Sequence, residues 1–253
     1  MSILALRDVR IPNGHAIRPT RRAAPRWLHH GSSNSQCIES ARPLETWPVW
    51  VARRTGFEIT NLGLAGQCQL DQFMARAIRD HPADVISLEL GINVVNADSM
   101  RERVFLSALH GFLDTVREGH PETPVLIFSP FICPVAETHP GSTPYTADRK
   151  VYTLERPDEL AQGALTLSRV RQLIAAEVTR RVYAGTSTCT SSTGSTYSDP
   201  RTRPTSQTVC IRTVPATFGS PSASQHKPPT CSLQALLHRT SRYRFSQGDV
   251  ELR

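Results

Sequence analysis

Between residues 26 and 183 the sequence alternates short apolar runs with longer amphipathic stretches, and this alternation limits the folds open to the chain. Strands are expected at 26–30, 57–62, 85–90 and 124–129, and helices at 44–54, 69–80, 101–118 and 157–183. Near-continuous apolar strands separated by helices are typical of a parallel sheet covered on both faces. We therefore predict an α/β fold whose ligand-binding loops follow the strands, at the carboxyl edge of the sheet.

Composition excludes several other classes of protein. No apolar run approaches the ~18 residues of a membrane span, and no short repeat recurs. The first ten residues lack the basic, apolar and small-residue order of a secretory signal, so we expect a cytoplasmic protein without a membrane partner. The six cysteines form no Cys-x-x-Cys pair, so the spacing gives little support for a metal site or a redox motif.

The chain divides into three parts by composition. Residues 1–25 are rich in Arg, Pro and Gly and are interpreted as a leader or linker, and residues 26–184 as the α/β domain. Residues 185–253 are rich in Ser and Thr and are expected to form a disordered tail. This tail has eight basic and three acidic residues and so carries +5 of the net charge of +7. The basic residues are scattered without an aromatic stacking order, which is a poor nucleic-acid footprint, and we expect no nucleic-acid partner.

Three loops at the predicted carboxyl edge hold the candidate catalytic residues. Ser33 follows the first strand, Gly66 the second and Asn93 the third. Each has an ordinary explanation by itself, as turn serine, turn glycine or helix cap. Together they offer a nucleophilic hydroxyl and three neutral donors for an oxyanion: the Ser33 N–H, the Gly66 N–H and the Asn93 amide.

In this order and context, Ser33, Gly66 and Asn93 resemble the first three sequence blocks of the SGNH (GDSL-type) esterase/acylhydrolase family. The phrases WPVWVARRTG, NLGLAGQC, IRDHPADVISLELGIN and HPETPVLIFSP resemble one branch of that family, and the likeness covers about residues 26–183. It implies a flavodoxin-like, three-layer α/β/α fold that hydrolyses small-molecule carboxylic esters through a serine nucleophile, without metal or cofactor. Ser32 stands where the family motif has Asp.

A serine esterase also needs a base, which this family takes from a final Asp-x-x-His-Pro motif. No Asp-x-x-His occurs in the chain. His226 and His238 lie in patternless sequence, and His139, after the fourth strand, is a poor substitute. We hypothesise a one-base frameshift near Ala184–Thr186, because codons allowed for residues 204–212 also permit Asp-Leu-Pro-Asp-Gly-Leu-His-Pro.

The sequence therefore favours a lipase-like serine esterase. As printed, the chain lacks the catalytic base, and we expect one edge of its sheet to be open. The alternatives are a catalytically dead domain that serves as a binding or interaction module, and a basic tail that contacts nucleic acid. Phe131, Ile132 and Tyr145 are candidates to line the substrate pocket or to pack the loop after the fourth strand.

Overall fold

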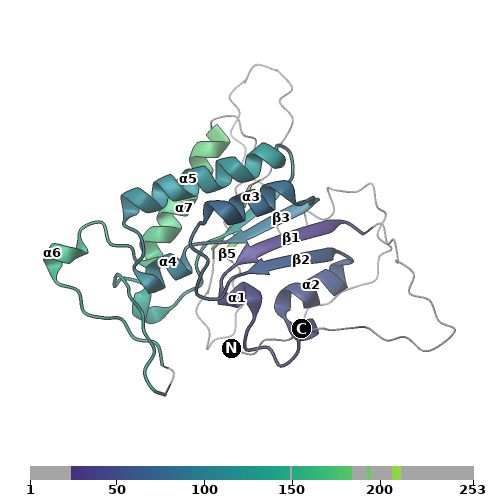
Figure 1. Cartoon of the computed structure of the whole chain (residues 1–253). Helices are drawn as coiled ribbons and strands as arrows, with labels where there is room; N and C mark the ends of the chain where they lie inside the picture. The colour runs from purple at the N-terminus through teal and green to yellow at the C-terminus, as the bar shows by residue number, and fades with distance from the viewer. Residues whose placement is uncertain (1–23, 149, 184–192, 195–206, 212–253) are drawn as a thin grey trace.

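The sheet is the centre of the fold in the computed structural model, which describes residues 24–148, 150–183, 193–194 and 207–211. Its strand order is β2-β1-β3-β4-β6-β5, and β1 to β4 run parallel (Figure 1). The strands are β1 (Arg26–Gly31), β2 (Glu58–Gly63), β3 (Val85–Glu89), β4 (Val125–Phe128), β5 (Thr193–Gly194) and β6 (Gln207–Ile211). The four predicted strands are thus confirmed in type and place.

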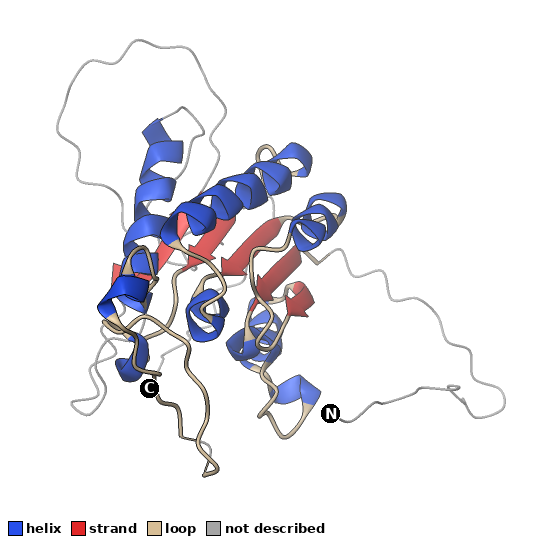
Figure 2. Cartoon of the chain, turned by 60° about the vertical axis from the view of Figure 1, so that its left-hand side comes forward, coloured by secondary structure: helices blue, strands red, loops and turns tan. Residues whose placement is uncertain are grey.

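Helices cover both faces of the sheet, which confirms the predicted three-layer α/β/α architecture. Helices α3, α5 and α7 lie on one face, and α1 and α2 on the other (Figures 1 and 2). The helices are α1 (Ser33–Gln36), α2 (Trp47–Thr55), α3 (Gln72–Asp80), α4 (Ile92–Ala97), α5 (Glu102–Gly119), α6 (Asp158–Ala161) and α7 (Leu167–Tyr183), with 3-10 turns η1 (Pro43–Glu45) and η2 (Pro134–Ala136).

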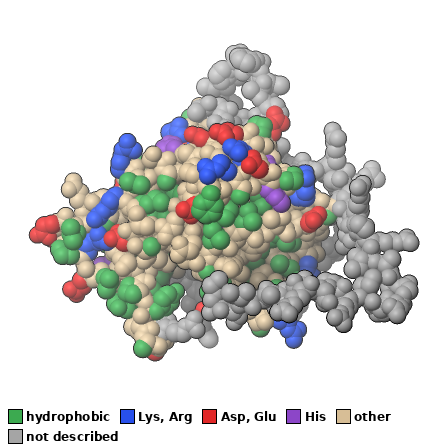
Figure 3. Space-filling model, viewed as in Figure 1, with side chains coloured by type: hydrophobic (Ala, Val, Ile, Leu, Met, Phe, Trp, Pro, Cys, Tyr) green, Lys and Arg blue, Asp and Glu red, His purple; other side chains and the backbone are tan. Residues whose placement is uncertain are grey.

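The hydrophobic core has two parts because the parallel strands are apolar on both sides. The larger part lies under α3, α5 and α7 and includes Ile86, Leu88, Phe112 and Ile174. The smaller part lies under α2 and comprises Trp27, Ala52, Val85 and Leu126. Burying a side chain of this size stabilises the fold by roughly 1.5–3 kcal/mol relative to leaving it exposed. On the outer face of α3 and α5, acidic and basic side chains are interspersed (Figure 3), as in the pair of Arg79 with Glu118.

Two local expectations about helices were wrong. The spacing of Leu70, Phe73, Met74, Ala77 and Ile78 predicts one apolar face on the helix at 69–80, but on α3 Phe73 is exposed, whereas Met74, Ala75 and Ile78 are buried. The long helix expected at 157–183 is broken into α6 and α7, with Gly163 at φ +71° between them. Positive φ suits glycine and ends a helix.

The edge strand β4 is paired, contrary to the expectation of an open edge. Strand β6 runs antiparallel to β4, with Val125 opposite Ile211 and Phe128 opposite Thr208. Apart from residues 193–194 and 207–211, the tail lies outside the described residues, as do the leader at 1–23, His226, His238 and the proposed frameshift point at Ala184–Thr186. In the part of the chain that the structure describes, no helix has the length and apolarity needed to cross a membrane.

Candidate active site

The candidate nucleophile, Ser33, lies in the tight turn that joins β1 to α1. Ser32 is the N-cap of α1, and its hydroxyl accepts a hydrogen bond from the Asn34 N–H at 3.2 Å. Ser33 is the first residue of the helix and is half-buried. A capped turn of this kind fixes the backbone around Ser33 and leaves the first helical N–H groups without intrahelical acceptors.

The buried carboxylate of Glu89 accepts hydrogen bonds from this turn. One oxygen of Glu89, Oε2, accepts hydrogen bonds from the Ser32 N–H and the Ser32 hydroxyl, both at 2.7 Å, and from the Ser35 hydroxyl at 2.9 Å. A Cβ on Gly31 would come within 2.7 Å of Glu89 Oε2, so only glycine fits at this close approach. Glu89 was not predicted as a site residue, although a single acid in an apolar strand was a usable signal.

Hydrogen bonds tie together the three loops that carry the predicted site residues. The Leu64 N–H donates to the Gly31 carbonyl at 2.7 Å, which links the second loop to the first. The Cys68 N–H donates to Asn93 Oδ1 at 3.0 Å, which links the second loop to the third. The loops after β1, β2 and β3 therefore meet at the carboxyl edge of the sheet, where the parallel topology predicts a site.

Gly66 and Asn93 have the donors that sequence analysis assigned to them. Gly66 is exposed at φ +72°, and within the described part of the chain its N–H has no acceptor. Asn93 is 4% exposed, and its Oδ1 is occupied by the Cys68 N–H. Because an amide carries its acceptor and its donor on opposite sides, the Asn93 NH₂ group faces away from Cys68 and is available as a donor.

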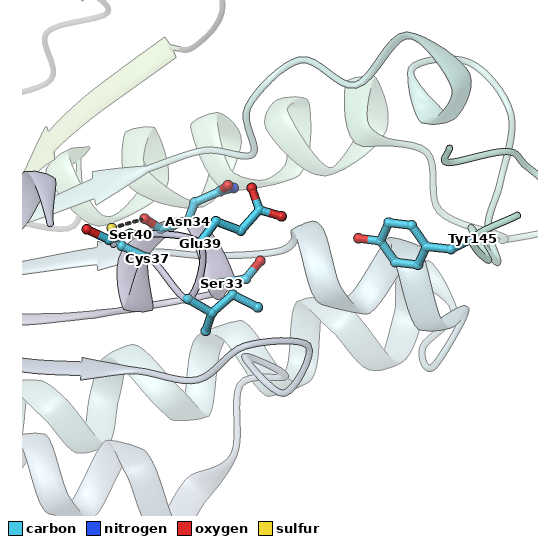
Figure 4. Close-up of a pocket in the computed structure, with 7 residues that line it drawn as sticks. Ser33, Asn34, Cys37, Glu39, Ser40 and Tyr145 are labelled. Carbon is cyan, nitrogen blue, oxygen red and sulfur yellow. Dashed lines mark hydrogen bonds between the residues drawn. The ribbon is translucent and has the colours of Figure 1, made fainter. Parts of the chain in front are cut away.

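An open cavity of about 720 Å³ lies beside the nucleophile turn (Figure 4). Ser33 lines it together with a run of the residues that follow it and with one residue of a distant loop: Asn34, Cys37, Ile38, Glu39, Ser40 and Tyr145. Of the three predicted site residues, only Ser33 is among this lining. Tyr145 lines the cavity, as one of the two interpretations expected, whereas Phe131 and Ile132 do not.

Tyr145 belongs to the long loop between β4 and α6. Hydrogen bonds and an ion pair join this loop to the segment that follows β3. The Thr143 N–H donates to the Asn96 carbonyl at 2.9 Å, and Arg156 pairs with Asp98 and donates to the Gly141 carbonyl. Residues 96 and 98 lie in and just after α4, the helix that begins beside Asn93. The cavity wall and the candidate oxyanion donor are therefore connected through α4.

None of the six histidines in the described residues contacts Ser33. His29 Nδ1 lies 2.6 Å from the Ser87 hydroxyl, and burial, with the neighbouring His30, lowers the pKa of His29 to about 3. His30 Nδ1 contacts the Leu62 carbonyl, and burial lowers the pKa of His30 as well. The remaining four have other partners or lie elsewhere: His81, His110, His120 and His139.

Among the residues that the structure describes, the thiols and acids are not arranged to bind a metal. Within the described residues, no three His, Cys, Asp or Glu side chains are grouped so that they could hold an ion. Cys68 is buried, and burial raises the pKa of its thiol. Cys37 and Cys133 are free and half-buried.

Residues 26–133 match the profile of the GDSL-like lipase/acylhydrolase family. This part of the chain is therefore similar to the SGNH/GDSL hydrolases. This match includes Ser33, Gly66 and Asn93 and agrees with the resemblance seen in the sequence. No curated protein sequence matches the chain.

Among solved structures, one with a TM-score above 0.5 supports the α/β fold of the domain. The salicylyl-acyltransferase SsfX3 from a tetracycline biosynthetic pathway is 27% identical with a TM-score of 0.52, and the match covers 65% of this chain and 41% of that one. A protein from Bacteroides ovatus named a GDSL-like lipase is 21% identical with a TM-score of 0.46, over 63% and 40% of the two chains. The chain thus spans less than half the length of both.

Proposed function

We propose that the domain is a serine acylhydrolase in which Ser33 attacks the carbonyl of a carboxylic ester. The observation that supports this most directly is the placement of Ser33 at the first position of α1, on the wall of an open cavity and hydrogen-bonded through its neighbours to a buried carboxylate. The attack forms a tetrahedral oxyanion, and collapse of that intermediate expels the alcohol and leaves an acyl group on Ser33 Oγ.

The oxyanion donors in this proposal are the N–H groups of Ser33 and Gly66 and the amide of Asn93. The Asn93 side chain is held in one orientation by the Cys68 N–H, so its NH₂ group does not have to reorganise during the reaction. Fixed donors of this type each contribute roughly 10²–10³ in rate. The matched family region and the hydrogen bonds that join the three loops support the assignment.

The base that should take the Ser33 proton has no counterpart among the described histidines, and the chain contains no Asp-x-x-His. A general base is worth about 10²–10⁴ in rate. We therefore propose that the chain as printed hydrolyses esters slowly or not at all, and that the frame-shifted reading of the tail restores the base.

A second candidate is transfer of the acyl group to an acceptor other than water. It is favoured by the likeness to SsfX3, an acyltransferase, and it uses the same acyl group on Ser33. The two functions differ only in what attacks this group. Product analysis with and without added alcohols separates hydrolysis from transfer.

The test compares the printed chain, its Ser33→Ala variant and a chain that carries the alternative reading after residue 184. With p-nitrophenyl acetate, the printed chain should be near background, and the restored chain should be at least ~10²-fold faster. Ser33→Ala in the restored chain should remove this gain. Sequencing the coding DNA across 184–186 checks the frameshift separately. Enzyme-like turnover by the printed chain that Ser33→Ala abolishes would show that a base is present elsewhere.

A further inference from the structure

Large apolar side chains are exposed in the two segments that contribute Ile38 and Tyr145 to the cavity wall. The first segment, in and before α2, carries Ile38, Leu44, Trp47 and Trp50, and the second carries Tyr145 and Tyr152; we call these six residues the apolar rim. Leu44 is 65% exposed, Trp50 48% and Tyr145 69%. Ile38 and Tyr145 also line the cavity, so the rim is continuous with it. The two segments project from the same side of the molecule (Figures 1 and 2).

Contacts with the site hold the rim in place. The indole N–H of Trp47 donates to the Asn34 carbonyl at 2.8 Å, which fixes Trp47 to the nucleophile turn. Its ring packs on His29 with the ring centres 5.0 Å apart. In the second segment, the Tyr152 N–H donates to the Pro144 carbonyl, and the backbone of Tyr145 forms an isolated antiparallel β-bridge with Val151. The held ring of Trp47 and the paired backbone around Tyr145 and Tyr152 therefore have less conformational freedom to lose on binding.

Two cations lie next to the tryptophans. Arg53 and Arg54 occupy the last turn of α2, and the Arg54 guanidinium lies 3.9 Å from the centre of the Trp50 ring. In the part of the chain that the structure describes, neither arginine has an acidic partner, whereas Arg42, near the start of the segment, pairs with Glu45. Guanidinium groups without carboxylate partners are suited to bind phosphate.

We propose that the apolar rim docks on a phospholipid surface, with the cavity mouth facing the lipid and Arg53 and Arg54 at the phosphate level. Trp and Tyr, which combine an apolar body with a polar tip, and Arg beside them match the lipid–water boundary. This contact is peripheral, unlike a spanning helix, and it revises the expectation that the protein has no membrane partner. Provided that the proposed function holds, esters carried in the lipid layer reach Ser33 from the same side.

The experiment measures binding of the full chain to sedimented vesicles of phosphatidylcholine, with and without an anionic phospholipid. Leu44→Gln with Trp50→Gln should lower the partition coefficient at least about tenfold on both kinds of vesicle, because two half-exposed apolar groups are lost. Arg53→Gln with Arg54→Gln should lower it roughly tenfold on the anionic vesicles. The matched control is Phe73→Gln, an equally exposed aromatic on α3, across the sheet from α2.

The outcomes separate this proposal from its rivals. Ser33→Ala should bind vesicles like the unchanged chain, so a failure of the esterase proposal leaves this test intact. Binding that excess inorganic phosphate abolishes would mean an anion site rather than a lipid surface. The proposal is overturned if the chain does not sediment with phosphatidylcholine, or if the Leu44/Trp50 variant binds as well as the Phe73 variant. It is also overturned if the rim variant converts a dimer to a monomer without any vesicle binding, since the rim would then join two copies of the chain.

Discussion

At the scale of single residues, Glu89 fixes the nucleophile turn more than any other side chain. It is 2% exposed, and one of its oxygens accepts all three hydrogen bonds from Ser32 and Ser35. A buried carboxylate is costly unless donors satisfy it, and here the donors to Oε2 come from the turn that presents Ser33, whereas Oε1 is buried without a partner among the described residues. The serine at position 32, where the related family motif has Asp, thus donates to an acid supplied by the next strand.

Replacing Glu89 should therefore unfold this turn first. We expect Glu89→Ala to lower the free energy of unfolding by about 2–4 kcal/mol, because three buried donors lose their acceptor. Chemical denaturation monitored by tryptophan fluorescence measures the change. Glu39→Ala, at an exposed position on the cavity wall, is the control and should change stability by less than ~0.5 kcal/mol. Equal effects of the two substitutions would contradict the anchoring role of Glu89.

His29 should make stability depend on pH. Its pKa in the folded chain is about 3, below the ordinary value of 6.5, because burial and His30 disfavour the charged form. Between these values the unfolded chain binds a proton that the folded chain does not, so stability falls as pH decreases from about 6.5 toward 3. The slope for one such histidine is at most ~1.4 kcal/mol per pH unit.

Denaturation curves at pH 7 and pH 5 check this dependence. In His29→Asn the amide can still contact the Ser87 hydroxyl but has no proton to gain, so the loss of stability between pH 7 and pH 5 should be smaller than in the unchanged chain. His139→Asn removes an exposed imidazole and serves as the matched control. An undiminished pH dependence in His29→Asn would be the contrary result.

At the scale of elements, α7 holds the loop that follows β4. Arg171 donates to both oxygens of Glu137 at 2.7 Å and to the Pro130 carbonyl at 2.9 Å. Its hydrogen bonds lower the pKa of Glu137. Two residues earlier on the same helix, Arg169 pairs with Glu102 on α5, but this pair is much more exposed.

These two arginines form a matched pair for substitution. Arg171→Met should cost about 1.5–3 kcal/mol of stability and speed amide hydrogen exchange at 130–137, because it strands a partly buried carboxylate. Arg169→Met should cost ~0–1 kcal/mol and leave that exchange unchanged. Hydrogen exchange read by mass spectrometry gives both results. Faster exchange at 130–137 in the Arg169 variant would mean that the loop depends on the helix as a whole.

The strands and long helices were predictable because their apolar spacing reports burial directly. The errors fall where a single residue or a distant contact decides the structure. Gly163 breaks a helix that the pattern allowed to continue, and Phe73 is exposed because the face that α3 presents depends on its packing against α5. Ser33, Gly66 and Asn93 were proposed from their order after strands. Glu89 was missed, because its role depends on a contact 57 residues away in the sequence.

At the scale of the whole molecule, the sheet joins four parallel strands to an antiparallel neighbour. Parallel strands are normally joined through a helix that crosses a face of the sheet, and β1 to β4 follow this rule. Strand β6 pairs with β4 in the opposite direction and covers the backbone of an apolar strand. The pairing is short, since it joins four residues of each strand.

The contribution of this pairing to the molecule can be measured by ending the chain after Tyr183. Four cross-strand pairs at ~0.2–1 kcal/mol each predict that the shortened chain loses about 1–4 kcal/mol of stability. An unpaired, apolar β4 also invites pairing between molecules, so the shortened chain should self-associate as its concentration rises. Analytical ultracentrifugation and denaturation of both lengths test this. If the shortened chain were monomeric and as stable as the full one, β6 would contribute nothing to the sheet, and the four parallel strands with their helices would fold without it.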